Sequence, residues 1–183
     1  MILKISDSQM LALWREGAGL EPASSEASIE RFDSVNIDSR LIRAMRAWYI
    51  DYLINADVDM VPVSDLTTYA RVSAGAKNGF WNVALLCPTA RIMAMRLHNA
   101  ECAIYDRAEC PPAMNNKFVR CGRRPFVWYT PGTNDATLFT GDATTPVITS
   151  VSGVEISDDD IYTVDERVLV EIPALAQKTL TML

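Results

Sequence analysis

The chain has 183 residues, of which 49% are hydrophobic and 22% charged, and its formal net charge is −6. This length suits one domain that buries about two thirds of its unfolded surface, and the composition is that of a globular protein. The longest apolar runs, residues 83–87 and 126–129, are much shorter than the ~20 residues of a membrane helix. Membrane-spanning and disordered classes are therefore excluded, and the sequence pI of about 4.8 argues against general polyanion binding.

The charge changes sign along the chain. Residues 1–60 carry 6 basic and 10 acidic side chains, residues 61–130 carry 9 and 4, and residues 131–183 carry 2 and 9. If these segments form separate surfaces, the molecule has complementary faces that favour oriented association. The alternative is that folding interleaves the charges.

Helical spacing marks the N-terminal third. Residues 8–16 predict a first helix capped by Asp7, residues 19–35 a surface loop, and residues 61–75 a short helix capped by Ser64. The strongest helical pattern covers residues 38–56, where apolar side chains recur at i, i+3 and i+4. On that helix a basic ridge, Arg40, Arg43 and Arg46, is expected either to pair with nearby acids or to contact a polyanion.

Strand-forming segments follow. Residues 80–87, 90–99, 102–106, 123–130, 136–141, 146–156 and 166–173 predict strands, although residues 89–108 also permit a helix. Residues 98–101 suggest a turn that brings 102–106 back against the preceding strand, and Pro131 with Gly132 suits a type II turn. Residues 174–183 predict a short terminal helix.

This order predicts an α+β fold and argues against a doubly wound nucleotide-binding fold. We expect a single domain with a helical part at residues 1–75, an antiparallel β-rich core, sandwich or barrel-like, at 76–173, and a tail helix at 174–183.

Catalytic and metal-binding patterns are not found. Cys87, Cys102, Cys110 and Cys121 lack zinc spacing and are expected to be reduced, buried thiols. His98 is the single histidine, no phosphate-binding glycine pattern occurs, and the acidic runs at 57–59 and 157–166 suggest solvated loops. No catalytic residue, cofactor or metal is therefore predicted, and an enzyme built on Cys121 or His98 is the least favoured class.

The segment "RCGRRPFVWYTPG" places arginines beside aromatic residues. Alternation within a strand puts at least half of the four residues 126–129 in a core, so we interpret the arginines as a charged entrance suited to an acidic protein surface. The expected interface residues are Arg120, Arg123 and Arg124, facing Asp158, Asp159 and Asp160 of a neighbouring molecule.

The segments "RAMRAWYIDYL", "NNKFVRCGRRPFVWYT" and "DERVLVEIPAL" occur in an order that resembles the small neck or ring proteins of tailed bacteriophages, particularly crAss-like viruses. The resemblance covers about two thirds of the chain. It implies a head-to-tail connector subunit that forms a closed ring, contacts portal, neck or tail proteins, and surrounds the channel for the genome. It implies no catalytic residues.

The sequence therefore leads to a structural assembly protein of the virion neck, made in the host cytoplasm, that works through ring-forming interfaces. No secretory signal is found at residues 1–10, which agrees with synthesis in the cytoplasm. The alternative is a nucleic-acid-contacting module that uses Arg40, Arg43 and Arg46 together with the basic residues between Lys117 and Arg124.

Overall fold

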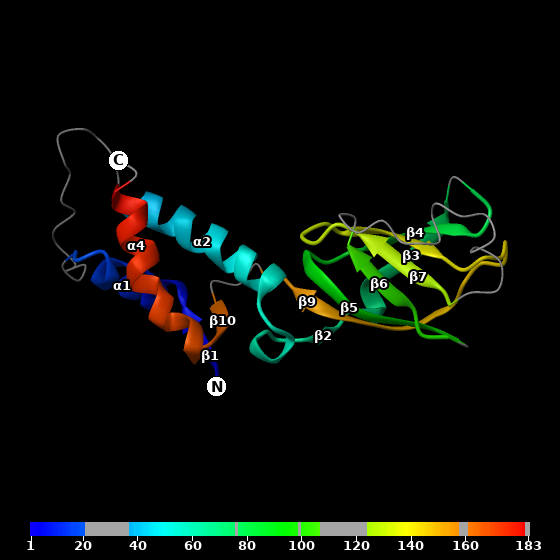
Figure 1. The fold of residues 1–183 in the computed structure, drawn as a ribbon, viewed down its shortest axis with the longest axis horizontal. Coiled ribbons are helices and arrows are strands. Elements are labelled where there is room, and N and C mark those ends of the chain that lie inside the picture. The colour runs from blue at the N-terminus through cyan, green and yellow to red at the C-terminus, as the bar shows by residue number, and fades with distance from the viewer. Residues whose placement is uncertain (21–36, 76, 99, 107–123, 158–160, 182–183) are drawn as a thin grey trace. The chain divides into compact units, whose positions relative to one another are not determined.

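The computed structural model describes residues 1–20, 37–75, 77–98, 100–106, 124–157 and 161–181. The chain forms two compact units: unit 1 comprises Met1–Val61 and Ser157–Leu183, and unit 2 comprises Pro62–Ile156. Helices and largely antiparallel sheets occur together, with a short helix near the C-terminus, so the predicted α+β class is confirmed (Figure 1). The predicted parts divide at residues 75 and 173 by element type, whereas the compact units divide after Val61 and after Ile156.

Unit 1 consists of helices that pack on a two-stranded sheet. Its described helices are α1 (Asp7–Gly17), α2 (Ile37–Asn55) and α4 (Ile172–Thr181), and its described strands, β1 (Ile2–Ser6) and β10 (Ile161–Asp165), are antiparallel. Ser6 and Gln9 form a capping box that starts α1 immediately after β1. The three described helices match predicted ones within two residues at each end, α4 over its described residues.

The core of unit 1 comes from the apolar stripe of each helix. The stripe of α2 is fully buried at Leu41, Met45 and Leu53, and α1 adds Met10 and Trp14. The end of α1 approaches α4 so closely that a Cβ on Gly17 would lie 2.7 Å from the Cα of Pro173. Glycine at position 17 is therefore a packing requirement of this helix pair.

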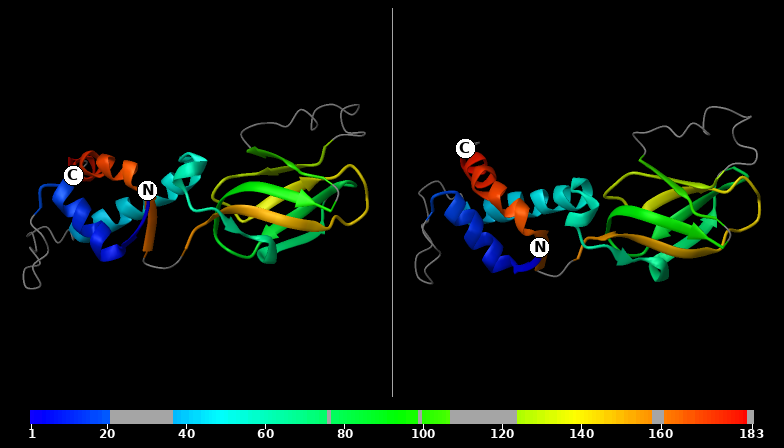
Figure 2. Two further views of the ribbon diagram at one scale, coloured as in Figure 1. Left: turned by 90° about the horizontal axis from the view of Figure 1, so that it is seen from below. Right: turned by 60° about the horizontal axis from the view of Figure 1, so that its bottom comes forward.

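The described part of unit 2 is built from two sheets with one core between them. The smaller sheet has the order β2 (Ser64–Asp65), β9 (Ile148–Glu155), β5 (Thr89–Leu97). The larger sheet has the order β3 (Ala70–Ala74), β4 (Phe80–Leu85), β8 (Asp135–Phe139), β7 (Phe126–Tyr129), β6 (Ala103–Asp106). The strands of the two sheets lie close together in both views of Figure 2. Alternate residues of both sheets meet in a single apolar cluster that includes Val83, Met95, Val127, Leu138 and Val151.

One side of this sandwich is closed in the manner of a barrel. The hydroxyl of Tyr129 on β7 accepts the N–H of Ile92 at 3.0 Å and donates to the Ile92 carbonyl at 3.3 Å. On either side of Ile92, the N–H of Gly132 donates to the carbonyl of Ala90, and the N–H of Cys102 donates to the carbonyl of Met95. The outer edge of β5 is thus hydrogen-bonded to groups from the other sheet and its connections.

Two predicted elements are wrong. Residues 61–75 do not form a helix: they hold β2, a single 3₁₀ turn at Thr67–Tyr69, and β3. The helical spacing of Leu66, Tyr69 and Ala70 reflects that one turn, which Asp65 fixes by accepting the N–H and hydroxyl of Thr67. Residues 166–171 form a 3₁₀ helix rather than a strand, because Asp165 caps it by accepting the N–H of Arg167.

Three further details differ from the prediction. Strand β1 was not expected, and residues 161–165 of the presumed acidic loop are strand β10, which pairs with β1. Strand β6 does follow a turn after β5, but it lies parallel to β7 and is joined to β5 only near its start, by the Arg96–Glu101 bridge and the Cys102–Met95 hydrogen bond. Its pairing partner lies more than twenty positions later in the sequence, beyond the reach of local pattern reasoning.

Candidate interaction surfaces

The exposed side of α2 carries two arginines in its N-terminal half and apolar side chains in its C-terminal half. Arg40, Arg43, Ala47 and Ile50 are all exposed, at positions that share one side of the helix. Within the described residues, neither Arg40 nor Arg43 has an ion-pair or hydrogen-bond partner. The acid nearest in sequence, Asp38, instead pairs with Arg15 of α1. As far as the described residues go, these two arginines are therefore open to an external partner.

Arg46, the third residue of the basic ridge, contacts another element of unit 1. It lies beside the hydroxyl of Tyr162 on β10, and that hydroxyl donates to Asp7 at 2.8 Å. Burial, together with the hydrogen bond to Asp7, raises the pKa of Tyr162 to about 12, so the phenol stays protonated. The ridge thus divides into a structural residue, Arg46, and two outward cations.

The charged entrance to β7 is described only at Arg124. Its guanidinium donates to the Glu101 carbonyl at 2.9 Å and pairs with the Glu101 carboxylate at 3.4 Å, with both side chains about half exposed. An exposed pair of this kind contributes little to stability. Arg120, Arg123, Asp158, Asp159 and Asp160, as well as Lys117, lie outside the described residues.

The apolar residues of β7 alternate as expected. Val127 and Tyr129 join the core between the sheets, whereas Phe126 lies on the other face of the larger sheet. There it belongs to a row of rings across four strands, with centroids 4.9 Å apart for Phe80–Phe139, 5.0 Å for Phe126–Phe139 and 5.9 Å for Tyr105–Phe126. Phe126 and Phe139 are only 4% and 3% exposed, so they do not offer open faces on which bases could stack.

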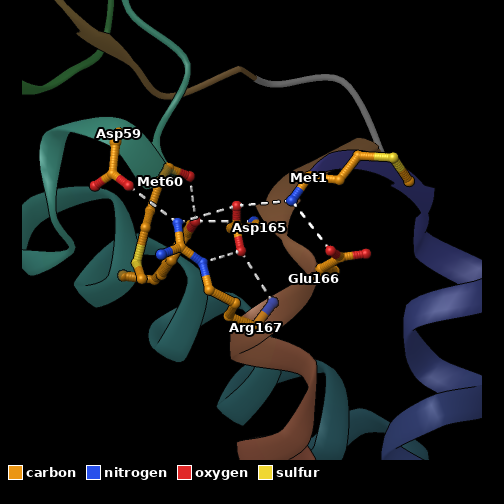
Figure 3. A network of polar contacts seen from close by, with 7 residues as sticks. Met1, Asp59, Met60, Asp165, Glu166 and Arg167 are labelled. Atoms are coloured by element: carbon orange, nitrogen blue, oxygen red, sulfur yellow. Dashed lines mark hydrogen bonds and ion pairs between the residues drawn. The ribbon is translucent and has the colours of Figure 1, made fainter.

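A polar network joins the two sequence segments of unit 1. The Asp165 carboxylate accepts from the Met1 amino group at 3.2 Å and from Arg167 at 2.7 Å, and Arg167 also pairs with Asp59 at 3.1 Å (Figure 3). Asp59 lies shortly before unit 2 in the chain, and Asp165 follows the return into unit 1. The network therefore links the segment that leads out of unit 1 to the segment that leads back into it.

The contacts of this network hold the chain segments of unit 1 together. The Asp165 side chain is 3% exposed, and the hydrogen bonds from Arg167 and the amino group hold the pKa of its carboxyl well below the usual range. A carboxylate that is ionised at neutral pH and already accepts several hydrogen bonds is poorly suited to take a proton from a substrate.

The residues proposed for an enzyme do not form a described site. His98 is exposed beyond the end of β5, where its backbone N–H bonds to the carbonyl of Val147. Cys87 and Cys102 are free and buried, and burial raises the pKa of Cys102 to about 11, which keeps it an unreactive thiol. Cys110 and Cys121 lie outside the described residues. In the described ranges, no three His, Cys, Asp or Glu side chains are grouped closely enough to hold a metal ion.

The alternating charge of the sequence follows the two units in part. Unit 1 contains 8 basic and 16 acidic residues, whereas unit 2 contains 9 basic and 7 acidic residues. The positive middle segment therefore falls almost entirely in unit 2, and most of the acidic residues fall in unit 1.

Sequence reasoning missed the tyrosines that cap a strand edge. The hydroxyls of Tyr49 and Tyr52 on α2 accept the N–H groups of Thr163 and Asp165 on β10, each at 3.0 Å. Both tyrosines fall on the stripe that helical spacing marks in residues 38–56, but their hydroxyl contacts depend on a strand that the sequence pattern did not predict.

No family model matches this sequence, and no curated protein or solved structure is significantly similar to it. None of the helices within the described ranges combines the length and apolar character needed to cross a membrane.

Proposed function

We propose that this protein is a structural assembly subunit that acts through protein–protein interfaces, most specifically a ring-forming neck or head-to-tail connector of a tailed phage. The observation that supports this proposal best is the pair of outward cations Arg40 and Arg43, which have no partner among the described residues, on an otherwise acidic unit. A heterologous contact in a ring needs two different, complementary faces on each copy.

In this proposal the α2 face of one copy meets an acidic surface of the next. The cationic half supplies orientation, and the adjoining Ala47 and Ile50 supply apolar area; the Ile50 side chain is 40% exposed. Arg120, Arg123 and Arg124 with Asp158, Asp159 and Asp160 are a second proposed pair of complementary surfaces. The partners are further copies of the chain and neighbouring portal, neck or tail proteins, in the virion.

The experiment is multi-angle light scattering of the full chain, alone and mixed with the portal and neck proteins of the same virus, followed by electron microscopy of the largest species. The proposal expects a defined large oligomer, closed in projection, that forms alone or with a partner. A chain that stays monomeric in every mixture would contradict it.

DNA contact is the second candidate, and the same two outward arginines, without described partners, favour it. It differs from the first by its salt dependence, because each phosphate contact releases counterions. Flat binding curves at low salt would exclude it.

A further inference from the structure

The bonds from β10 to the hydroxyls of Tyr49 and Tyr52 show which way the backbone N–H and carbonyl groups of β1 and β10 point. Because Thr163 and Asp165 donate their N–H groups to α2, those groups point away from β1. Their antiparallel partners are Lys4 and Ile2, so the N–H and carbonyl groups of Lys4 and Ile2 point away from β10. The bond from the Glu166 N–H to the Met1 carbonyl at 2.9 Å fits the same alternation.

These backbone groups form an open edge. Among the residues that the structure describes, nothing hydrogen-bonds to the backbone of Ile2 or Lys4 on that side, and both residues are exposed, Ile2 at 46%. The open edge ends at Lys4, because the N–H of the next outward residue, Ser6, bonds to the Gln9 side chain at 3.1 Å.

Several other edges in the described part of the chain are capped at particular positions. Tyr49 and Tyr52 cap β10, and Tyr129, Gly132 and the Cys102 N–H cap β5. On β3, the Arg71 guanidinium folds back onto the Ala70 carbonyl at 2.9 Å. Proteins protect strand edges in these ways because an open row of backbone groups pairs readily with another strand. The edge of β1 at Ile2 and Lys4 has no such cap among the described residues.

We propose that β1 pairs with β1 of a second copy of this chain, antiparallel, with Leu3 opposite Leu3 and Ile2 opposite Lys4. In this register the open N–H and carbonyl groups of Ile2 and Lys4 in each copy meet those of the other, giving four backbone hydrogen bonds. The Lys4 stem also covers the exposed Ile2 side chain of the other copy. The register that places Lys4 opposite Lys4 is disfavoured by like-charge repulsion.

Self-pairing suits this edge better than a longer foreign strand. Only two residues of β1 offer open groups, and a second β1 offers the same short row with matching ends. The contact is small compared with stable interfaces, so the dimer is weak in isolation and gains strength where copies are held together. This inference does not depend on the proposed phage role.

The first test uses Lys4→Pro and its control Lys4→Thr in the full chain. Proline at position 4 removes the outward N–H while leaving the ladder to β10 intact, because that N–H does not point toward β10. Sedimentation velocity over a concentration series should show self-association of the wild type and of Lys4→Thr. The dissociation constant of the Lys4→Pro dimer should be higher by about tenfold or more, because two of the four backbone hydrogen bonds are lost.

The second test checks the register and does not depend on the proline variant. In a background with Cys110→Ser and Cys121→Ser, Leu3→Cys should form a disulfide-linked dimer under mild oxidation, because opposed residues at a non-hydrogen-bonded position lie close together. Lys4→Cys is the control and should not, since in this register its partner is Ile2.

Three results would overturn the inference. They are a wild type that stays monomeric up to near-millimolar concentration, a folded Lys4→Pro variant that associates as strongly as the wild type, and equal cross-linking of the Leu3→Cys and Lys4→Cys variants. Loss of large rings with retention of the weak β1 dimer would contradict the proposed function and leave this inference standing.

Discussion

The hydroxyl of Tyr52 on α2 accepts the backbone N–H of Asp165 on β10 at 3.0 Å, and the same hydroxyl donates to the carbonyl of Met60. Met60 lies at the exit of the chain from unit 1, and Asp165 lies just after its return. One buried phenol thus connects a helix with both of these segments, and it caps the strand edge that would otherwise be open.

Replacing Tyr52 with Phe should destabilise the protein by about 1–3 kcal/mol, because the variant leaves the buried Asp165 N–H without an acceptor. The measurement is urea unfolding followed by near-ultraviolet circular dichroism. Tyr69→Phe is the matched control, since Tyr69 is 40% exposed and should change the free energy of unfolding little. Equal effects of the two variants would refute the role of the Tyr52 hydroxyl.

The Asp165 network predicts a loss of stability in acid. Its carboxyl has a folded-state pKa below the ordinary value, so its contribution is complete above the ordinary pKa of about 4 and is lost as the pH falls toward the folded-state pKa. Asp165→Asn should therefore lower the free energy of unfolding at neutral pH and flatten its decline between about pH 5 and about pH 2.

Asp135→Asn is the control for this effect, because Asp135 is an exposed carboxylate on β8. It should keep the pH dependence of the wild type. An unchanged slope in Asp165→Asn would show that the network does not link folding to protonation.

Much of the helical part of the fold could be predicted from the sequence, and less of the strand pairing. Leu41, Met45 and Tyr49 repeat at helical spacing, so local pattern alone identifies α2. The strand β10 could not be found in this way: its four acidic neighbours suggested a loop, and its partner β1 lies more than 150 positions earlier. Pairing between segments so distant leaves only a weak local pattern.

For the interaction surfaces, too, local pattern was visible in the sequence but contacts between distant residues were not. The basic ridge was visible at positions 40, 43 and 46, but the sequence could not show that Arg46 lies against Tyr162 while Arg40 and Arg43 face outward. Nor could it show that Arg124 reaches Glu101, because that contact depends on where β6 and β7 lie.

The proposed α2 contact predicts that Arg40→Glu with Arg43→Glu weakens assembly without unfolding the protein. Both side chains are exposed and lack described partners, so the change in the free energy of unfolding should be within about 0.5 kcal/mol per site. Light scattering should show a shift toward smaller species. Lys77→Glu, an exposed reversal between β3 and β4, is the control and should assemble as the wild type does.

DNA binding gives a prediction that separates the two candidate functions. For an assembly protein, fluorescence anisotropy with labelled DNA should detect at most weak binding that Arg40→Glu with Arg43→Glu changes little. Strong binding that falls steeply with added salt, and that the double variant abolishes, would favour the DNA-contacting module instead.

The most direct test of the central claim is the mass distribution of the wild-type protein, measured by light scattering at low and at high salt. Assembly through complementary charged faces predicts a defined oligomer, alone or with a neck or portal partner, that dissociates as salt screens the contact. A monomer at every salt concentration, with and without these partners, would contradict the claim.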